Sequence, residues 1–278
     1  RRKPKISQLR TVDGETLMSQ PLHPPDFVVN GLLSKGLHIL AGSPKVGKSW
    51  LAVTVAKGEP VWRMNTRQGT TLYLCLEDSY SRIQNRLLDL TEDAPSTLHF
   101  AVMSEQLHGG LVEQMEQFLR EHPATGLVVI DTLQRIRAAG NEPNPYASDY
   151  RDIGVLKALA DRHRIAILLL HHLRKLSDED PMNMISGTTG LSGATDSNFV
   201  LRRSKRRENT ATLYCTGRDI PYRELSLEFN SETHIWNLLS DDCGQAEQSC
   251  GRILFLLSAL LREQPEICAP AKALLEKI

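Results

Sequence analysis

Short apolar runs alternate along the chain with longer segments whose apolar residues recur at helical spacing. The apolar runs occupy residues 38–41, 70–76, 98–103, 127–130 and 165–170. Continuous runs of this length are typical of strands that are buried on both faces of a parallel sheet. The helical segments occupy residues 50–56, 79–90, 111–121 and 153–163. This alternation predicts an α/β fold in which a mostly parallel sheet is flanked by helices.

The pattern changes in the last third of the chain, where apolar runs become shorter and polar turns separate them. These runs occupy residues 198–202, 211–215 and 225–229. They predict antiparallel strands at the C-terminal edge of the sheet. A polar linker is expected at residues 238–249, with helices after it. We therefore expect three parts: a basic N-terminal arm (1–26), one α/β domain (27–240) and a small C-terminal helical segment (250–278).

The first apolar run leads into a sequence pattern that binds phosphate. Residues 42–49 match G-x-x-x-x-G-K-[ST] between a predicted strand and a predicted helix. Glycines let the backbone approach phosphates closely, and the N–H groups of the loop and of the helix N-terminus attract their negative charge. Lys48 is predicted to reach the β- and γ-phosphates of ATP, and the Ser49 hydroxyl to bind Mg²⁺. The predicted nucleotide-binding residues are Gly42, Ser43, Pro44, Lys45, Val46, Gly47, Lys48, Ser49 and Trp50.

Acidic and histidine side chains directly follow three other predicted strands. Glu77 follows the strand at 70–76, Asp131 follows the strand at 127–130, and a histidine pair follows the strand at 165–170. The carboxyl ends of parallel strands meet at one edge of a sheet. If these strands are parallel neighbours, all of these side chains share a crevice with the phosphate loop.

Each of these side chains suits a step of ATP hydrolysis. Asp131 is predicted to hold Mg²⁺ together with Ser49. Glu77 is predicted to act as general base toward the attacking water, with Asp78 as the fallback. His172 is predicted to sense the γ-phosphate. The alternatives are an aspartate that caps the following segment, a solvated glutamate at a strand end and a purely structural histidine pair.

Five cations lie within residues 202–207, between two of the C-terminal runs. Such a hairpin tip is either a solvated turn or an arginine finger that stabilises transition-state charge in a neighbouring subunit. The candidates for the finger are Lys205 and Arg207 in the tip and Arg218 further along the chain.

Two polar segments, at residues 133–150 and 177–189, follow the strands that precede Asp131 and the histidine pair. The first has no clean period, and irregular stretches of this length are usually functional or mobile. Cations near these segments can contact a nucleic-acid backbone, although ordinary surface loops are the alternative. These cations are Arg135, Arg137, Arg174 and Lys175.

The overall charge restricts how the chain can bind nucleic acid. Lys and Arg total 33 of the 278 residues and Asp and Glu also total 33, so the net charge is zero. Any contact with nucleic acid must therefore be local and salt-sensitive. No apolar run is long enough to span a membrane, so no membrane partner is expected. Five cysteines without a CxxC pair indicate reduced thiols and a cytoplasmic location.

Taken together, the motifs resemble those of the RecA-like ATPases, and most closely the RepA branch of hexameric plasmid helicases, near the DnaB replicative helicases. The segments that carry the resemblance are GSPKVGKS at 42–49, YLCLED at 73–78, LVVIDTL at 127–133, LLLHHLRK at 168–175 and ISGTTGLSGATD at 185–196. The phosphate loop is common to many NTPases. The acid after the second strand, the double histidine and the SGTTGLSG stretch considerably narrow the choice among NTPase families.

The resemblance implies a RecA-like ATPase domain over residues 27–240 and specific roles for several residues. Glu77 corresponds to the catalytic carboxylate, Asp131 to the Mg²⁺-coordinating acid and His172 to the γ-phosphate-linked histidine. The TGRD sequence at 216–219 resembles the element that reaches the neighbouring nucleotide, which favours Arg218. Ile185 stands where the family often has an arginine, so the role of that arginine is not transferred.

The resemblance also implies an assembly and partners. The family forms rings, typically of six subunits, with ATP at the subunit interfaces and single-stranded DNA in the centre. The segment after Cys250 resembles the start of a helix-turn-helix.

Three functions are compatible with these features. The first is a Mg²⁺-dependent ATPase that acts as a ring-forming motor on single-stranded DNA, a replicative helicase of a plasmid, phage or mobile element. The second is a RecA-like ATPase that acts as loader, regulator or recombination accessory without strong unwinding. The third, a small-molecule kinase, would need a second substrate pocket and an arginine-rich lid. Stimulation of ATP turnover by single-stranded DNA distinguishes the first function from the others.

Overall fold

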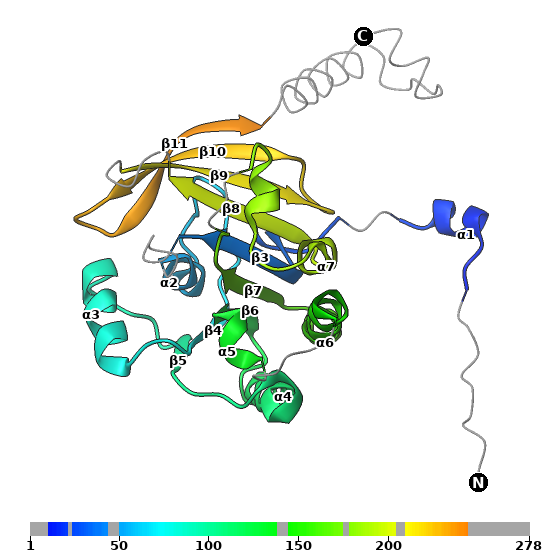
Figure 1. Cartoon of the computed structure of the whole chain (residues 1–278), viewed down its shortest axis with the longest axis horizontal. Coiled ribbons are helices and arrows are strands. Elements are labelled where there is room, and N and C mark those ends of the chain that lie inside the picture. The colour runs from blue at the N-terminus through cyan, green and yellow to red at the C-terminus, as the bar shows by residue number, and fades with distance from the viewer. Residues whose placement is uncertain are drawn as a thin grey trace, which may run out of the picture.

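The computed structural model describes residues 11–21, 24–43, 50–137, 144–174, 178–203 and 209–243. Within these ranges the chain forms a nine-stranded sheet, flanked by helices on both faces, and a separate two-stranded hairpin (Figure 1). The helices are α1 (Gly14–Ser19), α2 (Trp50–Lys57), α3 (Tyr80–Leu90), η1 (Leu107–Leu111), α4 (Val112–Glu121), α5 (Leu133–Ile136), α6 (Pro145–His163), η2 (Pro181–Met184) and α7 (Thr189–Gly193).

The strands, most of which follow predicted apolar runs, are β1 (Phe27–Val29), β2 (Leu33–Ser34), β3 (Gly36–Gly42), β4 (Thr70–Cys75), β5 (Leu98–Ala101), β6 (Thr125–Asp131), β7 (Ala166–His171), β8 (Ser197–Arg203), β9 (Thr210–Gly217), β10 (Arg223–Asn230) and β11 (Ile235–Cys243). The small hairpin pairs β1 with β2, and the large sheet has the order β11-β10-β9-β8-β3-β7-β6-β4-β5.

The large sheet is mostly parallel, with antiparallel strands at its C-terminal edge, so the predicted fold class is confirmed. β8, β3, β7, β6, β4 and β5 pair in parallel, whereas β9, β10 and β11 are antiparallel to their neighbours. One expectation was only partly right. β8 was expected to be antiparallel, and it is antiparallel to β9 but parallel to β3, because the chain crosses back through α7 before entering the sheet.

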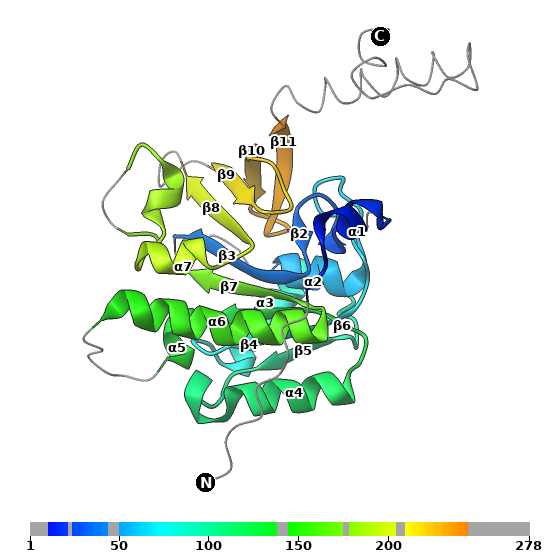
Figure 2. The same cartoon turned by 90° about the vertical axis from the view of Figure 1, so that its right-hand side faces the viewer.

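Two apolar cores cover the two faces of the sheet. Alternate residues of each central strand face opposite sides, so Leu40 and Leu168 pack with α2 and α3, whereas Ile39 and Leu169 pack with α4, α6 and α7. Figure 1 shows the two groups of helices on either side of the sheet, and Figure 2 shows α6 and α4 lying along one face. This sandwich fixes the ends of the parallel strands.

Two further expectations about element boundaries were wrong. α6 begins at Pro145, inside the stretch predicted to be irregular, because the side chain of Asn144 caps it by accepting the N–H of Ala147 at 3.1 Å. β11 occupies the first part of the predicted polar linker. Its outer half carries Asp241 and Asp242, and acidic side chains are common on edge strands because they discourage further pairing.

The ends of the chain are described only in part. Residues 1–10 and the predicted helical segment at 250–278 lie outside the described residues. The part of the N-terminal arm that is described contains α1, which is capped by Asp13 and buries none of its residues. Among the described helices, none has the combination of length and hydropathy that a bilayer span requires.

His38 generates a prediction about pH. Its side chain is fully buried in β3 and donates through Nε2 to the carbonyl oxygen of Ser34 at 2.7 Å. Burial lowers its pKa from 6.5 to about 4. Between pH 6.5 and pH 4 this imidazole is therefore protonated in the unfolded chain but neutral in the folded chain. The free energy of unfolding consequently falls as the pH is lowered from 6.5 to 4, by about 3 kcal/mol in total.

We expect His38→Gln to remove most of this dependence, so that the free energy of unfolding in urea changes less between pH 7 and pH 4.5 than it does in the wild type. An equally steep loss of stability in the variant would contradict the assignment.

Candidate functional site

Four neighbouring strands end at the same edge of the sheet. In the parallel order β3, β7, β6, β4, the last residues are Gly42, His171, Asp131 and Cys75, and Glu77 comes two residues after β4. The register places Asp131 opposite Cys75 on one side and opposite Leu170 on the other. The expectation that the strand ends converge is therefore confirmed, while the roles of the individual residues stay predictions.

Glu77 is held by the segment that follows β6 and remains open to solvent. Its side chain is 47% exposed, and its Oε1 lies 3.8 Å from Nε of Arg135. The hydroxyl of Thr132 donates to the same oxygen at 3.4 Å. These neighbours orient the carboxylate, and its exposure leaves it accessible to water. This combination suits a general base.

Asp78, the fallback base, faces α3. Its carboxylate forms an ion pair with Arg86 and lies 4.0 Å from Nη1 of Arg82. Because both cations belong to α3, this carboxylate is engaged in holding that helix. The geometry therefore favours Glu77 over Asp78.

Asp131 is the candidate Mg²⁺ ligand. It is half-buried at the end of β6, and its Oδ2 accepts a hydrogen bond from the hydroxyl of Tyr73 at 3.1 Å. The peptide bond between Asp131 and Thr132 is cis. A carboxylate oriented by a neutral donor, one strand away from β3 across β7, fits a hard cation that also binds nucleotide phosphates.

The two histidines at the end of β7 differ in their surroundings. His171 is buried and donates through Nε2 to the carbonyl oxygen of Ser186 at 2.7 Å. Burial lowers its pKa, so His171 is neutral at pH 7. His172 is half-buried, and its carbonyl oxygen accepts the N–H of Ser186 at 3.0 Å. His171 therefore has a structural anchor, and His172 stays the candidate for sensing phosphate.

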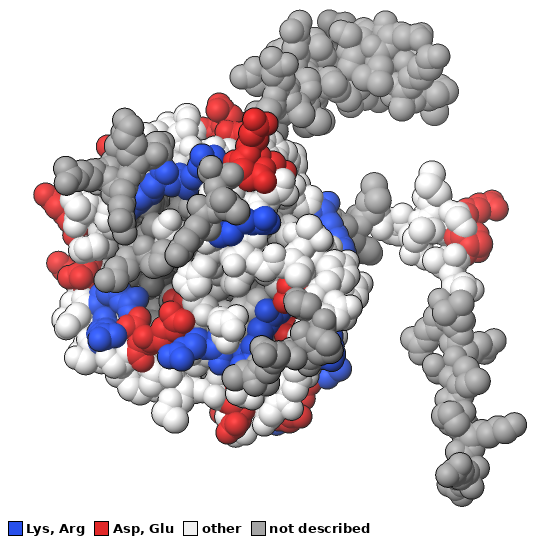
Figure 3. Space-filling view, in the orientation of Figure 1, with Lys and Arg blue, Asp and Glu red and all other residues white. Residues whose placement is uncertain are grey.

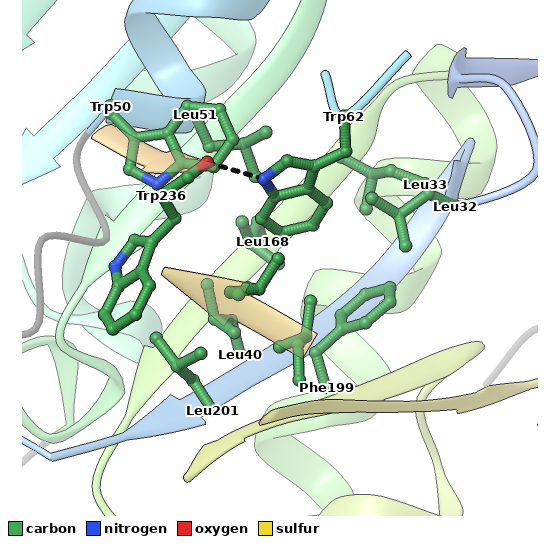
Figure 4. A pocket seen from close by; sticks show the side chains of 12 residues that line it. Leu32, Leu33, Leu40, Trp50, Leu51, Trp62, Leu168, Phe199, Leu201 and Trp236 are labelled. Atoms are coloured by element: carbon green, nitrogen blue, oxygen red, sulfur yellow. Dashed lines mark hydrogen bonds between the residues drawn. The ribbon is translucent and has the colours of Figure 1, made fainter. Parts of the chain in front are cut away.

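Only the two ends of the predicted phosphate loop can be placed. Gly42 is the last residue of β3, Ser43 follows it, and Trp50 begins α2, whereas Pro44, Lys45, Val46, Gly47, Lys48 and Ser49 lie outside the described residues. The Trp50 side chain is buried and faces the core, with its ring 5.3 Å from that of Trp62. It lines an apolar pocket with Trp62 and Trp236 (Figure 4), where Nε1 of Trp62 donates to the carbonyl oxygen of Trp236 at 2.7 Å. Any contact of Trp50 with phosphate is thus limited to its backbone.

Arg218 lies at the opposite end of the parallel strands, near the start of β3. It follows β9, where Gly217 pairs with Ser197, and Ser197 in turn pairs with His38 near the start of β3. Its backbone N–H donates to the carbonyl oxygen of Asp196 at 2.8 Å, and its side chain is 62% exposed. Arg218 therefore lies at the end of the strands opposite to Gly42, where the predicted phosphate loop begins. The other candidates, Lys205 and Arg207, lie outside the described residues.

Arg137 was expected to contact nucleic acid, but the structure places it inside the protein. Its side chain is 17% exposed, and Nη1 lies 2.9 Å from Oδ1 of Asp149. Its Nε lies 3.0 Å from Oδ2 of Asp152. An arginine paired with two buried carboxylates is not available to a phosphate backbone. Lys175 lies outside the described residues.

Basic side chains gather in two places on the face seen in Figure 3, over the β8–β9 end of the molecule and over α3 and α5. Acidic side chains lie beside the second group. The described arginines of these elements include Arg82, Arg86, Arg135, Arg202 and Arg203. The guanidinium of Arg203 lies 5.2 Å from the ring centre of Trp236, so it packs on an aromatic surface.

Sequence reasoning missed two residues that hold the site together: Tyr73 and Thr132. Tyr73 carried a usable signal, because a tyrosine in an otherwise aliphatic buried run needs a polar partner for its hydroxyl. Thr132 carried no such signal, since its partner Glu77 comes from another segment of the chain.

Comparisons with known proteins agree with the fold that carries this site. The family model of AAA domains matches residues 3–178. A solved structure described as an ATPase domain has a TM-score of 0.59 and 18% identity, over 74% of this chain and 85% of that one. The structure of a DnaB-like replicative helicase and its interactions with primase has a TM-score of 0.61 and 17% identity, over 81% of this chain and 66% of that one. Among curated proteins, none matches the chain. The expected RecA-like, DnaB-type fold is confirmed.

Cys75 provides a test of how closed the base of the site is. It is buried at the end of β4, and burial, together with the charge of Asp131, raises the pKa of its thiol to about 12. Because the thiolate is the reactive form, we expect Cys75 to resist iodoacetamide at pH 8 in the folded protein and to react in urea. Mass spectrometry of the peptide that contains Cys75 measures this, and equal rates in both conditions would contradict a buried thiol.

Proposed function

The chain belongs to the AAA domain family, and from this premise we propose that it hydrolyses ATP with Mg²⁺ and acts as a ring-forming motor on single-stranded DNA. The observation that carries the proposal is the order of four parallel strands, β3, β7, β6 and β4, which end side by side. This order supports a single crevice shared by the phosphate loop, the histidine pair, Asp131 and Glu77.

In the proposed reaction each side chain has one task. Glu77 accepts a proton from the water that attacks the γ-phosphate. Asp131 and Ser49 would hold Mg²⁺, and the bound metal would neutralise charge that develops on the phosphates. Lys48 and the backbone N–H groups of residues 42–49 hold the β- and γ-phosphates.

The position of Arg218 supports hydrolysis at subunit interfaces. Because it lies at the sheet edge opposite its own phosphate loop, it can reach a nucleotide only on a neighbouring subunit. A head-to-tail contact of this kind repeats around a closed ring. Single-stranded DNA in that ring would contact local cations, because the chain as a whole has no net charge.

The first experiment measures ATP turnover with and without single-stranded DNA in the wild type, Glu77→Gln and Asp78→Asn. We expect DNA to stimulate the wild type, and Glu77→Gln to lower turnover by about 10²–10⁴-fold because the base is lost. Asp78→Asn, the matched control at the adjacent position, should stay within about threefold of the wild type, since its carboxylate pairs with α3.

Full activity of Glu77→Gln would refute the assigned base. Turnover that is indifferent to DNA would favour a loader, regulator or recombination accessory over a motor.

A second experiment mixes two inactive variants, Glu77→Gln and Arg218→Ala. If the base and the finger belong to different subunits, an equal mixture contains about one quarter of sites with both residues intact, and turnover recovers to about that fraction. If both residues acted within one chain, no mixture would recover activity.

A further inference from the structure

A set of polar contacts leads away from the histidine pair toward the segment that follows Asp131. It begins at Ser186, which binds both histidines: its carbonyl oxygen accepts from His171 Nε2 at 2.7 Å, and its N–H donates to the carbonyl oxygen of His172 at 3.0 Å. Ser186 thus fixes the backbone at the end of β7. The position of His172 therefore depends on the residues that hold Ser186 in place.

Two residues further on, Thr188 is bound by a buried carboxylate of α6. Both its N–H and its hydroxyl donate to Oδ2 of Asp149, at 3.0 and 2.8 Å. Gly187 between them has φ +107°, a backbone conformation that side chains disfavour, and a Cβ there would lie 3.4 Å from the same Oδ2. The chain is therefore turned at a glycine so that Thr188 faces Asp149.

Asp149 is in turn paired with Arg137, the residue that follows α5. Nη1 of Arg137 lies 2.9 Å from Asp149 Oδ1, and its Nε lies 3.0 Å from Asp152 Oδ2. Nε2 of His108 lies 2.8 Å from the other oxygen of Asp152. Both aspartates are buried, so these contacts are weakly screened, and losing one partner leaves a charge uncompensated.

These contacts form a polar network that connects the ends of two neighbouring strands. β6 and β7 pair along their length, and beyond their ends Arg137, Asp149, Thr188 and Ser186 join the segment after β6 to the segment after β7. The strand ends that carry Asp131 and the histidine pair are therefore connected in two ways, by the hydrogen bonds of the sheet and by this polar network.

We propose that Arg137 and Asp149 are positioning residues that act through Thr188 and Ser186 to hold His172 at the γ-phosphate. The inference rests on the proposed ATP hydrolysis for its consequence, but the positioning itself can be measured without nucleotide. Because Asp149 accepts two hydrogen bonds from Thr188 and pairs with Arg137, its carboxylate connects the two halves of the polar network.

The first test is hydrogen exchange of the Ser186 amide in the absence of nucleotide. Asp149→Asn removes the charge, and Thr188→Val, a milder change, removes only the hydroxyl. Both should accelerate exchange of the Ser186 amide by about tenfold or more, because a hydrogen bond to a charged group is lost. Asp161→Asn is the matched control: it makes the same substitution on α6, where Asp161 pairs with Lys157 at 2.9 Å near the surface, and should leave the exchange unchanged.

The second test separates kcat from KM in the same three variants. Asp149→Asn and Thr188→Val should lower kcat by about tenfold while KM for ATP stays within about twofold, because the misplaced group acts on the γ-phosphate in the transition state. Unfolding midpoints identify any variant that is globally destabilised. If Asp149→Asn is destabilised in this way, the kcat and KM of Thr188→Val decide whether the proposal holds.

Two outcomes overturn the proposal: Ser186 exchange that equals the wild type in both variants, or accelerated exchange with unchanged kcat. If the wild type itself does not hydrolyse ATP, the proposed function fails. The exchange measurement then decides alone whether Asp149 and Thr188 hold the backbone of His172.

Discussion

Backbone hydrogen bonds pair β3, β7, β6 and β4 in parallel, so the last residues of all four strands lie at the same end of the sheet. The strands are buried on both faces and cannot slip without moving apolar side chains out of the two cores. Every candidate group of the crevice depends on this register. Side-chain contacts such as Tyr73 to Asp131 then adjust the direction of groups that the sheet has already brought together.

The opposite edge of the sheet has a different character. There Asp196 is buried, accepts the N–H of Leu37 at 2.9 Å and pairs with Lys157 at 2.8 Å, which anchors the start of β3 to α6. Arg218 lies beside this anchor. One end of the parallel strands thus presents the groups proposed for hydrolysis, and the other presents an exposed arginine whose neighbour Asp196 is anchored to β3 and α6. A head-to-tail assembly of such subunits would bring the two edges together.

Much of the fold could be predicted from the sequence, because continuous apolar runs and turn residues report strands directly. β4, β6 and β7 were found from such runs, and so were the residues that follow them. The direction of β8 could not be predicted, since it depends on where the preceding crossover re-enters the sheet. The start of α6 was missed because a cap at Asn144, not an apolar period, defines it. The interior position of Arg137 was equally invisible, because its partners Asp149 and Asp152 meet it only after folding.

The most direct measurement is a crystal structure of the chain with Mg²⁺ and a non-hydrolysable ATP analogue. We expect the phosphates between β3 and α2, the metal on the side of Asp131, and Glu77 and His172 facing the γ-phosphate. An analogue bound elsewhere, for example at the edge that carries Asp196 and Arg218, would show that convergence of the strand ends does not create the nucleotide site.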